Sequence, residues 1–180
     1  MALSATIFKA EVNIADMDRH YYQTHNLVLA QHPSETDIRM MVRILAFALN
    51  ANEALQFTKG LSTEDEPELW QKSLSDEIEL WIELGQPDEK RIRKACSRAR
   101  QVVVYCYSGH SAEIWWEQIA RQLHRFDNLK VVNLPADGCE ALASMAQRTM
   151  HLNISLQDGM VSVSDNEQNI DITPEVRYPA

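Results

Sequence analysis

The sequence predicts an α/β protein with a parallel β-α-β-α-β core and antiparallel hairpins at both termini. Three apolar segments, 78–84, 102–107 and 129–134, have the length and composition of strands, and helical patterns lie between them. Strands that alternate with helices form parallel sheets through right-handed crossovers. Period-two alternation near both ends of the chain indicates hairpins instead. We expect a single domain over residues 1–180.

The N-terminal part of the chain predicts a hairpin followed by a helix. Apolar residues alternate with polar ones over 3–14, a turn falls at 15–19, and 20–31 has the pattern of a second strand. Residues 35–52 carry apolar side chains at three- and four-residue spacing, which predicts an amphipathic helix. Ser34 stands before this helix and is a suitable N-cap residue.

The middle of the chain begins irregularly and then becomes a regular succession of strands and helices. Residues 55–76 contain an acidic loop and a short candidate strand at 69–72. Gly85 ends the strand 78–84, and Pro87 suits the first position of a helix that reaches about Ala99. Further helices are expected at about 110–124 and 137–146, and Ser108 or Ser111 would cap the first of them.

The C-terminal segment returns to period two. In "MHLNISLQDGMVSVS", Asp158-Gly159 is typical of the tight turn of a hairpin. The segment 168–173 predicts one more strand.

Composition and charge exclude several classes of protein. No apolar run approaches the ~20 residues of a membrane helix, and the first residues lack the apolar core of a signal peptide, so we expect a cytoplasmic protein. The net charge of −9 disfavours broad nucleic-acid binding. Cys96, Cys106 and Cys139 form no C-x-x-C pair, which indicates reduced thiols. The sequence contains neither a hydrolase nucleophile elbow nor a glycine-rich nucleotide-binding motif.

Two acidic residues on the strand 78–84 raise the main question about function. Glu79 and Glu83 point to the same face of the strand, with Trp81 between them. If that face is a solvent edge, the carboxylates need no partner. If it is covered, they require a cation such as Mg²⁺ or a basic side chain, because an unpaired buried charge is costly.

A basic run follows this strand. Arg91, Lys94 and Arg98 form one helical stripe, and Lys90 lies beside it. Such a run is usually a solvated helix face. As a functional site it would be a local phosphate-facing surface for a nucleic-acid partner.

Acidic residues upstream of the strand complete a weak nuclease motif. Pro67-Glu68, a gap, and then Glu83-Leu84-Gly85 resemble the PD-(D/E)XK signature, in which two acids on neighbouring strands hold a divalent metal and a nearby Lys helps to activate water. Gly85 stands where that motif has its Lys. Lys94, in the following helix, could reach back and replace it.

A more specific resemblance covers residues 1 to about 172. It rests on "MALSATIFKAEVNIADMDR", "HPSET", "LQFTKGLSTEDEPELW", "LWIELGQPDEKRIRKA", "IWWEQ" and "QDG", which together resemble the YaeQ family of bacterial proteins. The resemblance implies a small cytosolic α/β protein with a variant of the restriction-endonuclease-like fold. It implies no particular activity.

These observations lead to two hypotheses about function. The first is a nuclease or phosphodiesterase of PD-(D/E)XK type that depends on Mg²⁺ or Mn²⁺, with Glu68, Glu83 and Lys94 as catalytic residues. Its metal ligands would be drawn from five acidic residues: Glu35, Glu66, Glu68, Glu79 and Glu83. The second is a non-catalytic binding protein on the same fold, with a protein or nucleic-acid partner. An acid–arginine network through Arg39, Arg43 or Arg91 would explain the acids without catalysis.

Overall fold

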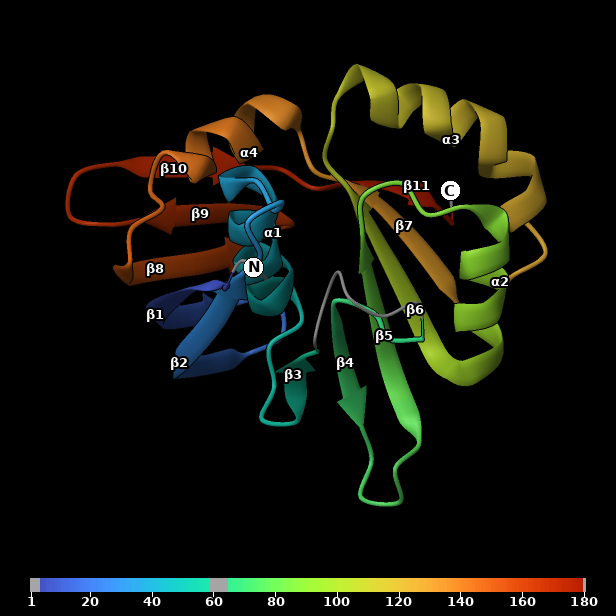
Figure 1. Ribbon diagram of the computed structural model, residues 1–180, viewed down its shortest axis with the longest axis horizontal. Helices are drawn as coiled ribbons and strands as arrows, with labels where there is room; N and C mark the ends of the chain where they lie inside the picture. The colour runs from blue at the N-terminus through green and yellow to red at the C-terminus, as the bar shows by residue number, and fades with distance from the viewer. Residues whose placement is uncertain (1–3, 59–64, 180) are drawn as a thin grey trace. The chain divides into compact units, whose positions relative to one another are not determined.

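The computed structural model describes residues 4–58 and 65–179 and divides into two compact units (Figure 1). The first unit combines Met1–Leu49 with Asp137–Pro174, and the second combines Asn50–Ala136 with Glu175–Ala180. Each unit contains one sheet. The chain is therefore a mixed α/β protein, as the sequence predicts, whereas a single domain over 1–180 stays a prediction.

The first unit is built on a five-stranded sheet of order β10-β9-β8-β1-β2. Its strands are β1 (Thr6–Asp16), β2 (Tyr21–Gln31), β8 (Thr149–Gln157), β9 (Met160–Ser164) and β10 (Asn169–Ile172). Both predicted hairpins are present, because β1 pairs antiparallel with β2 and β8 pairs antiparallel with β9. They join through a parallel pairing of β1 with β8, so the two hairpins form one sheet.

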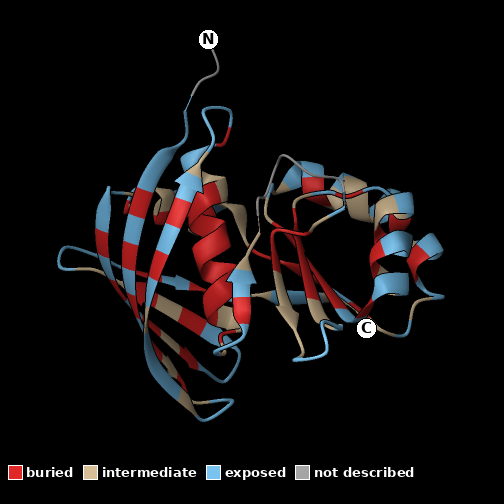
Figure 2. Ribbon diagram, turned by 60° about the horizontal axis from the view of Figure 1, so that its bottom comes forward, coloured by how far each residue is buried: buried red, intermediate tan, exposed pale blue. Residues whose placement is uncertain are grey.

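Helix α1 (Asp37–Leu49) packs against one face of this sheet, where the ring of Phe47 contacts His25 of β2. Every residue of α1 from 40 to 48 is buried, and Figure 2 shows the helix almost wholly in the colour of buried residues. The expected cap at Ser34 is wrong. The helix starts later, and the hydroxyl of Thr36 accepts the hydrogen bond from the Arg39 amide instead. Helix α4 (Ala136–Ala143) follows the second unit's last parallel strand.

The second unit contains the predicted parallel core. Its sheet has the order β11-β7-β6-β5-β4-β3, in which β5 (Ile78–Leu84), β6 (Ala99–Cys106) and β7 (Leu129–Asn133) are parallel. Helices α2 (Glu89–Arg98) and α3 (His110–Leu123) connect them, as predicted. Strand β4 (Leu69–Lys72) pairs antiparallel with β5. Strands β3 (Leu55–Phe57) and β11 (Glu175–Tyr178) extend the sheet at its two ends and were not predicted.

The core of the second unit lies between its sheet and the helices α2 and α3. Trp81 and Val104 of the sheet pack with Ile92 of α2 and Leu123 of α3, all of them at most 1% exposed. The same face of β5 carries Glu83, because side chains two residues apart on a strand point the same way. The predicted carboxylate face is therefore a covered face and not a solvent edge.

Two predicted helix starts in this unit are also wrong. Asp88 is the N-cap of α2, so Pro87 lies before the helix and not at its first position, and the Asp88 carboxylate accepts a hydrogen bond from the Arg91 amide at 2.8 Å. Gly109, with a φ of 62°, caps α3 without a side-chain hydrogen bond, so neither Ser108 nor Ser111 has that role.

Two further expectations concern the membrane and the cysteines. No helix in the described ranges is long and apolar enough to cross a membrane. All three cysteines are free thiols. Burial raises the pKa of Cys96 and Cys106 to about 11 and that of Cys139 to about 12, which keeps them protonated at neutral pH.

Candidate functional site: two buried acids and an arginine

Two acidic side chains meet where β4 approaches β5. Glu68 directly precedes β4, and its amide donates to the carbonyl of Ile82 at 3.0 Å. Since Leu69 pairs with Ile82, Glu68 stands opposite Glu83 on the same face of two neighbouring strands. Both residues are buried, with 6% and 4% of their surface exposed. The placement of two acids on adjacent strands thus agrees with the sequence pattern.

Arg91 binds the Glu83 carboxylate. Its Nε donates to both carboxylate oxygens at 2.9 Å, and its Nη2 lies 2.8 Å from Oε1. The indole N–H of Trp81 donates to the same Oε1 at 2.8 Å. Arg91 Nη2 also donates to the backbone carbonyl of Glu66 at 2.8 Å. We call Glu83, Arg91 and Trp81 the clasp.

The local sequence explains why Arg91 reaches back over the strand. Gly85 follows β5 with a φ of 96°, a conformation that favours glycine, and lets the chain turn at once. With Asp88 as the N-cap, Arg91 falls in the first turn of α2. A cation is unfavourable there because the N-terminal end of a helix carries partial positive charge. The carboxylate of Glu83 offsets that effect.

The electrostatics of the clasp reflect two opposing effects. Burial raises the pKa of Glu83 above its ordinary value, and the nearby charge of Glu68 adds to the rise. The hydrogen bonds and charge of Arg91 and the hydrogen bond of Trp81 lower it, and the net direction is upward. Charge-assisted contacts from an arginine to both oxygens of a carboxylate are strong and geometrically specific hydrogen bonds.

Lys94 lies away from this pair of acids. Half of its side chain is exposed, and its Nζ binds the Asp65 carboxylate at 2.5 Å. The hydrogen bond and charge of Lys94 lower the pKa of Asp65. Arg98, one turn further on, donates to the Asp65 carbonyl at 2.7 Å, and its guanidinium lies 5.2 Å from the ring centre of Trp81.

The remaining predicted ligands also have partners or separate positions. Glu79 accepts a hydrogen bond from the Gln71 side chain at 2.8 Å. Glu35 belongs to the first unit, where its two carboxylate oxygens bind Arg43 at 2.6 Å and Arg39 at 2.7 Å. Glu66 is half-buried and contributes its backbone carbonyl to Arg91.

A resident divalent metal does not fit these residues as they are arranged. Within residues 4–58 and 65–179, no group of three or more His, Cys, Asp or Glu side chains is placed to hold a metal ion. Arg91 takes the carboxylate that the nuclease motif would give to the metal. The catalytic roles of Glu68, Glu83 and Lys94 and the ligand roles of the acids stay predictions.

The predicted basic stripe is largely engaged within the second unit. Arg91 binds Glu83, Lys94 binds Asp65, and Arg98 lies over Trp81. Lys90 is exposed beside them. The sequence identified Arg91 as a potential partner of the acids, but gave no signal for Asp65 as the partner of Lys94.

Comparison with known proteins places the whole chain in one family. Residues 1–174 match the family model described as YaeQ protein. YaeQ proteins of Salmonella typhi and Escherichia coli (strain K12) are 49% and 46% identical over 172 residues, which covers 96% of this chain and 95% of each relative. The crystal structure of YaeQ from Xanthomonas axonopodis pv. citri has a TM-score of 0.94 and 49% identity, with 97% of this chain and 98% of that chain covered. YaeQ from Pseudomonas syringae has a TM-score of 0.93 and 34% identity, with 98% and 97% covered. The chain therefore belongs to the YaeQ family.

Proposed function

We propose that this chain is a non-catalytic binding protein on a restriction-endonuclease-like core, in which Arg91 stands where a nuclease of that type would hold its metal. The succession β5-α2-β6-α3-β7, with β4 antiparallel to β5, supports that kind of core. Glu68 and Glu83 correspond to the two strand acids, and Gly85 takes the place of the motif lysine.

The bidentate contact between Arg91 and Glu83 carries this proposal. It neutralises the buried Glu83 carboxylate with a side chain of the same unit, so Glu83 has a counter-charge without an added ion. A metal would have to displace a guanidinium that also binds the Glu66 carbonyl. Displacement would therefore remove the contacts of Arg91 with both the Glu83 carboxylate and the Glu66 carbonyl.

A protein is the favoured partner. The net charge of −9 repels phosphate backbones, and Arg91, Lys94 and Arg98 already bind groups of their own unit. A nucleic-acid partner that contacts Lys90, Arg91, Lys94 and Arg98 is the alternative. That alternative requires Arg91, Lys94 and Arg98 to leave their present partners.

One observation favours a second candidate, a nuclease or phosphodiesterase. Glu68 and Glu83 stand opposite each other, both buried, as the acids of the PD-(D/E)XK motif do. In that case Mg²⁺ or Mn²⁺ would be the cofactor, and Lys94 would have to leave Asp65 to reach the site.

Calorimetry with Mg²⁺ and Mn²⁺, combined with cleavage assays on DNA and RNA, distinguishes the two candidates. We expect the wild type to show neither a metal site at millimolar concentration nor cleavage. Arg91→Ala should gain weak metal binding, because it exposes the Glu83 carboxylate beside Glu68, and the additional change Glu83→Gln should abolish that gain. A wild-type metal site that is lost in Glu83→Gln, with cleavage that is lost in Lys94→Ala, would establish the nuclease and overturn our proposal.

A further inference from the structure

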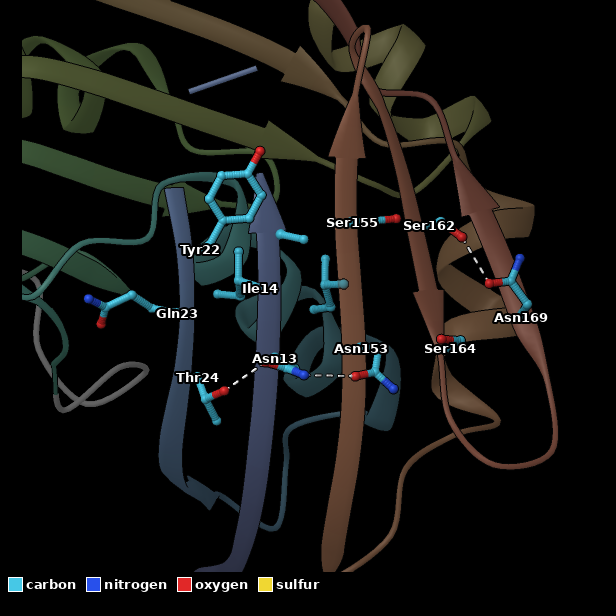
Figure 3. Close-up of a pocket in the computed structure, with 12 residues that line it drawn as sticks. Asn13, Ile14, Tyr22, Gln23, Thr24, Asn153, Ser155, Ser162, Ser164 and Asn169 are labelled. Atoms are coloured by element: carbon cyan, nitrogen blue, oxygen red, sulfur yellow. Dashed lines mark hydrogen bonds between the residues drawn. The ribbon is translucent and has the colours of Figure 1, made fainter. Parts of the chain in front are cut away.

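The sheet of the first unit has an exposed face, opposite α1, that is hollowed into a cavity of about 590 Å³ (Figure 3). This volume falls in the range of small-ligand sites, about 300–1,000 Å³. The cavity lies over two rows of side chains that cross all five strands. The first row consists of Thr24, Asn13, Asn153, Ser164 and Asn169. The second consists of Tyr22, Ala15, Ser155, Ser162 and Asp171.

The cavity lining carries no side chain that is charged at neutral pH. Asp171 ends the second row on the edge strand but does not line the cavity. The charged groups of this face gather in the next rows, where His151 pairs with Glu11 at 2.7 Å and Lys9 lies beyond them. Nearly a quarter of the residues in the chain are charged. The neutral lining across five strands is therefore separated from the charged part of the surface.

Hydrogen bonds orient the amides of this cavity. The Thr24 hydroxyl donates to Asn13 Oδ1 at 2.6 Å, and Asn13 Nδ2 donates to Asn153 Oδ1 at 3.3 Å, as the dashed lines in Figure 3 mark. These two hydrogen bonds leave Asn153 Nδ2 able to donate to a ligand, since no described side chain accepts a hydrogen bond from it. Hydroxyls of Ser155 and Ser164 lie beside it. Side-chain groups therefore recur at the strand spacing of about 4.8 Å, able both to donate and to accept.

An aromatic ring stands at one end of the second row. Tyr22 is 58% exposed. Its ring offers a flat apolar surface beside the amide and hydroxyl groups. The cavity thus combines one stacking platform with a row of neutral hydrogen-bonding groups.

We infer that this cavity binds a neutral oligosaccharide. Adjacent sugar hydroxyls donate and accept in the same way as the amide and hydroxyl rows, and the apolar face of a sugar ring can stack on Tyr22. The neutral lining matches an uncharged ligand and excludes the cation-dependent contacts that nucleic acids require. A second sheet packed on this face would need several apolar residues there, and Ala15 is the one aliphatic side chain in the two rows. The inference concerns the first unit and is independent of the clasp.

NMR titration of the full ¹⁵N-labelled chain with cellotetraose, maltotetraose and chitotetraose tests the inference. We expect at least one of the three to shift amide signals of β1, β2, β8 and β9. Asn153→Asp keeps the side-chain size but replaces the outward donor with a negative charge, and should weaken binding at least tenfold. Tyr22→Ala, which removes the stacking ring, should weaken it by about tenfold, equivalent to about 1.4 kcal/mol.

Val28→Ala is the matched control, because Val28 is 61% exposed on the same face of β2 but lies outside the cavity. It should bind as the wild type does. The inference is overturned if none of the three sugars shifts these signals at millimolar concentration, or if the shifts persist unchanged in both Asn153→Asp and Tyr22→Ala. Preferential binding of an octathymidylate added in parallel would likewise overturn it in favour of nucleic acid.

Discussion

Arg91→Met is predicted to destabilise the protein mainly by leaving a buried carboxylate without its counter-charge. The substitution keeps an apolar stem of similar length but removes the contacts to both oxygens of Glu83 and the hydrogen bond to the Glu66 carbonyl. Removing one partner of a buried ion pair costs about 3–5 kcal/mol. Glu83 is 4% exposed, but the Arg91 side chain is 28% exposed, so we expect about 3 kcal/mol, at the lower end.

The unfolding free energy that Arg91→Met loses should increase as the pH rises. Burial raises the pKa of Glu83, and without Arg91 the rise becomes larger. A raised folded-state pKa means that stability is greatest below the ordinary value of 4.5 and falls as pH rises toward the folded-state pKa. The difference between Arg91→Met and the wild type should therefore be small near pH 4 and reach its full size by about pH 7.

Urea unfolding followed by circular dichroism, at about pH 4 and about pH 7, measures the free energy of unfolding of the wild type and of Arg91→Met. Arg93→Met is the control, since Arg93 lies on the same helix with 54% of its side chain exposed and should lose less than about 1 kcal/mol. The double variant Arg91→Met/Glu83→Gln has no buried charge at position 83. It should therefore regain about 2 kcal/mol of the unfolding free energy that Arg91→Met loses. A loss for Arg91→Met below about 1 kcal/mol, or one of equal size at both pH values, would refute the account of the clasp.

Three further outcomes follow from the second unit and the cysteines. Lys94→Ala should change the free energy of unfolding by less than about 1 kcal/mol in urea titrations, because its bond to Asp65 is a surface ion pair; a larger loss would place it in the folded core. Ile92→Ala, at a fully buried position between α2 and the sheet, should cost about 2–5 kcal/mol by the same measurement, and a neutral result would contradict the packing described. Iodoacetamide at neutral pH should label half-buried Cys96 before buried Cys106 and Cys139, as mass spectrometry of digests would show; equal labelling in the folded state would contradict their burial.

The parallel core could be predicted because apolar runs in its strands are long enough to be distinctive. Strand β5 matches the predicted 78–84, and β7 lies within 129–134. Strand β6 starts at Ala99 rather than 102, since Arg100 and Gln101 interrupt the apolar run and the pairing with β5 extends the strand over them. Strands β3 and β11, which were not predicted, have three and four residues and pair with β4 and β7 at the two ends of the sheet.

The candidate site was partly predictable for similar reasons. Alternation on β5 placed Glu83 on the face of Trp81. The sequence also named Arg39, Arg43 or Arg91 as candidate members of an acid–arginine network, and the structure pairs Glu35 with Arg39 and Arg43. The partner of Lys94 could not be predicted, because Asp65 lies 29 residues away and meets it only through the tertiary fold. The caps at Thr36, Asp88 and Gly109 differ from the predicted helix starts. Thr36 and Asp88 accept a side-chain hydrogen bond from the first turn, whereas Gly109 makes none.

Paramagnetic broadening by Mn²⁺ tests most directly whether Arg91 takes the place of a metal at the two buried acids. In NMR spectra of the ¹⁵N-labelled wild type, added Mn²⁺ should leave the amide signals of Glu68 and Glu83 sharp, whereas in Arg91→Ala the same signals should broaden. Broadening of those signals in the wild type, reversed by Mg²⁺ and absent in Glu83→Gln, would contradict the account.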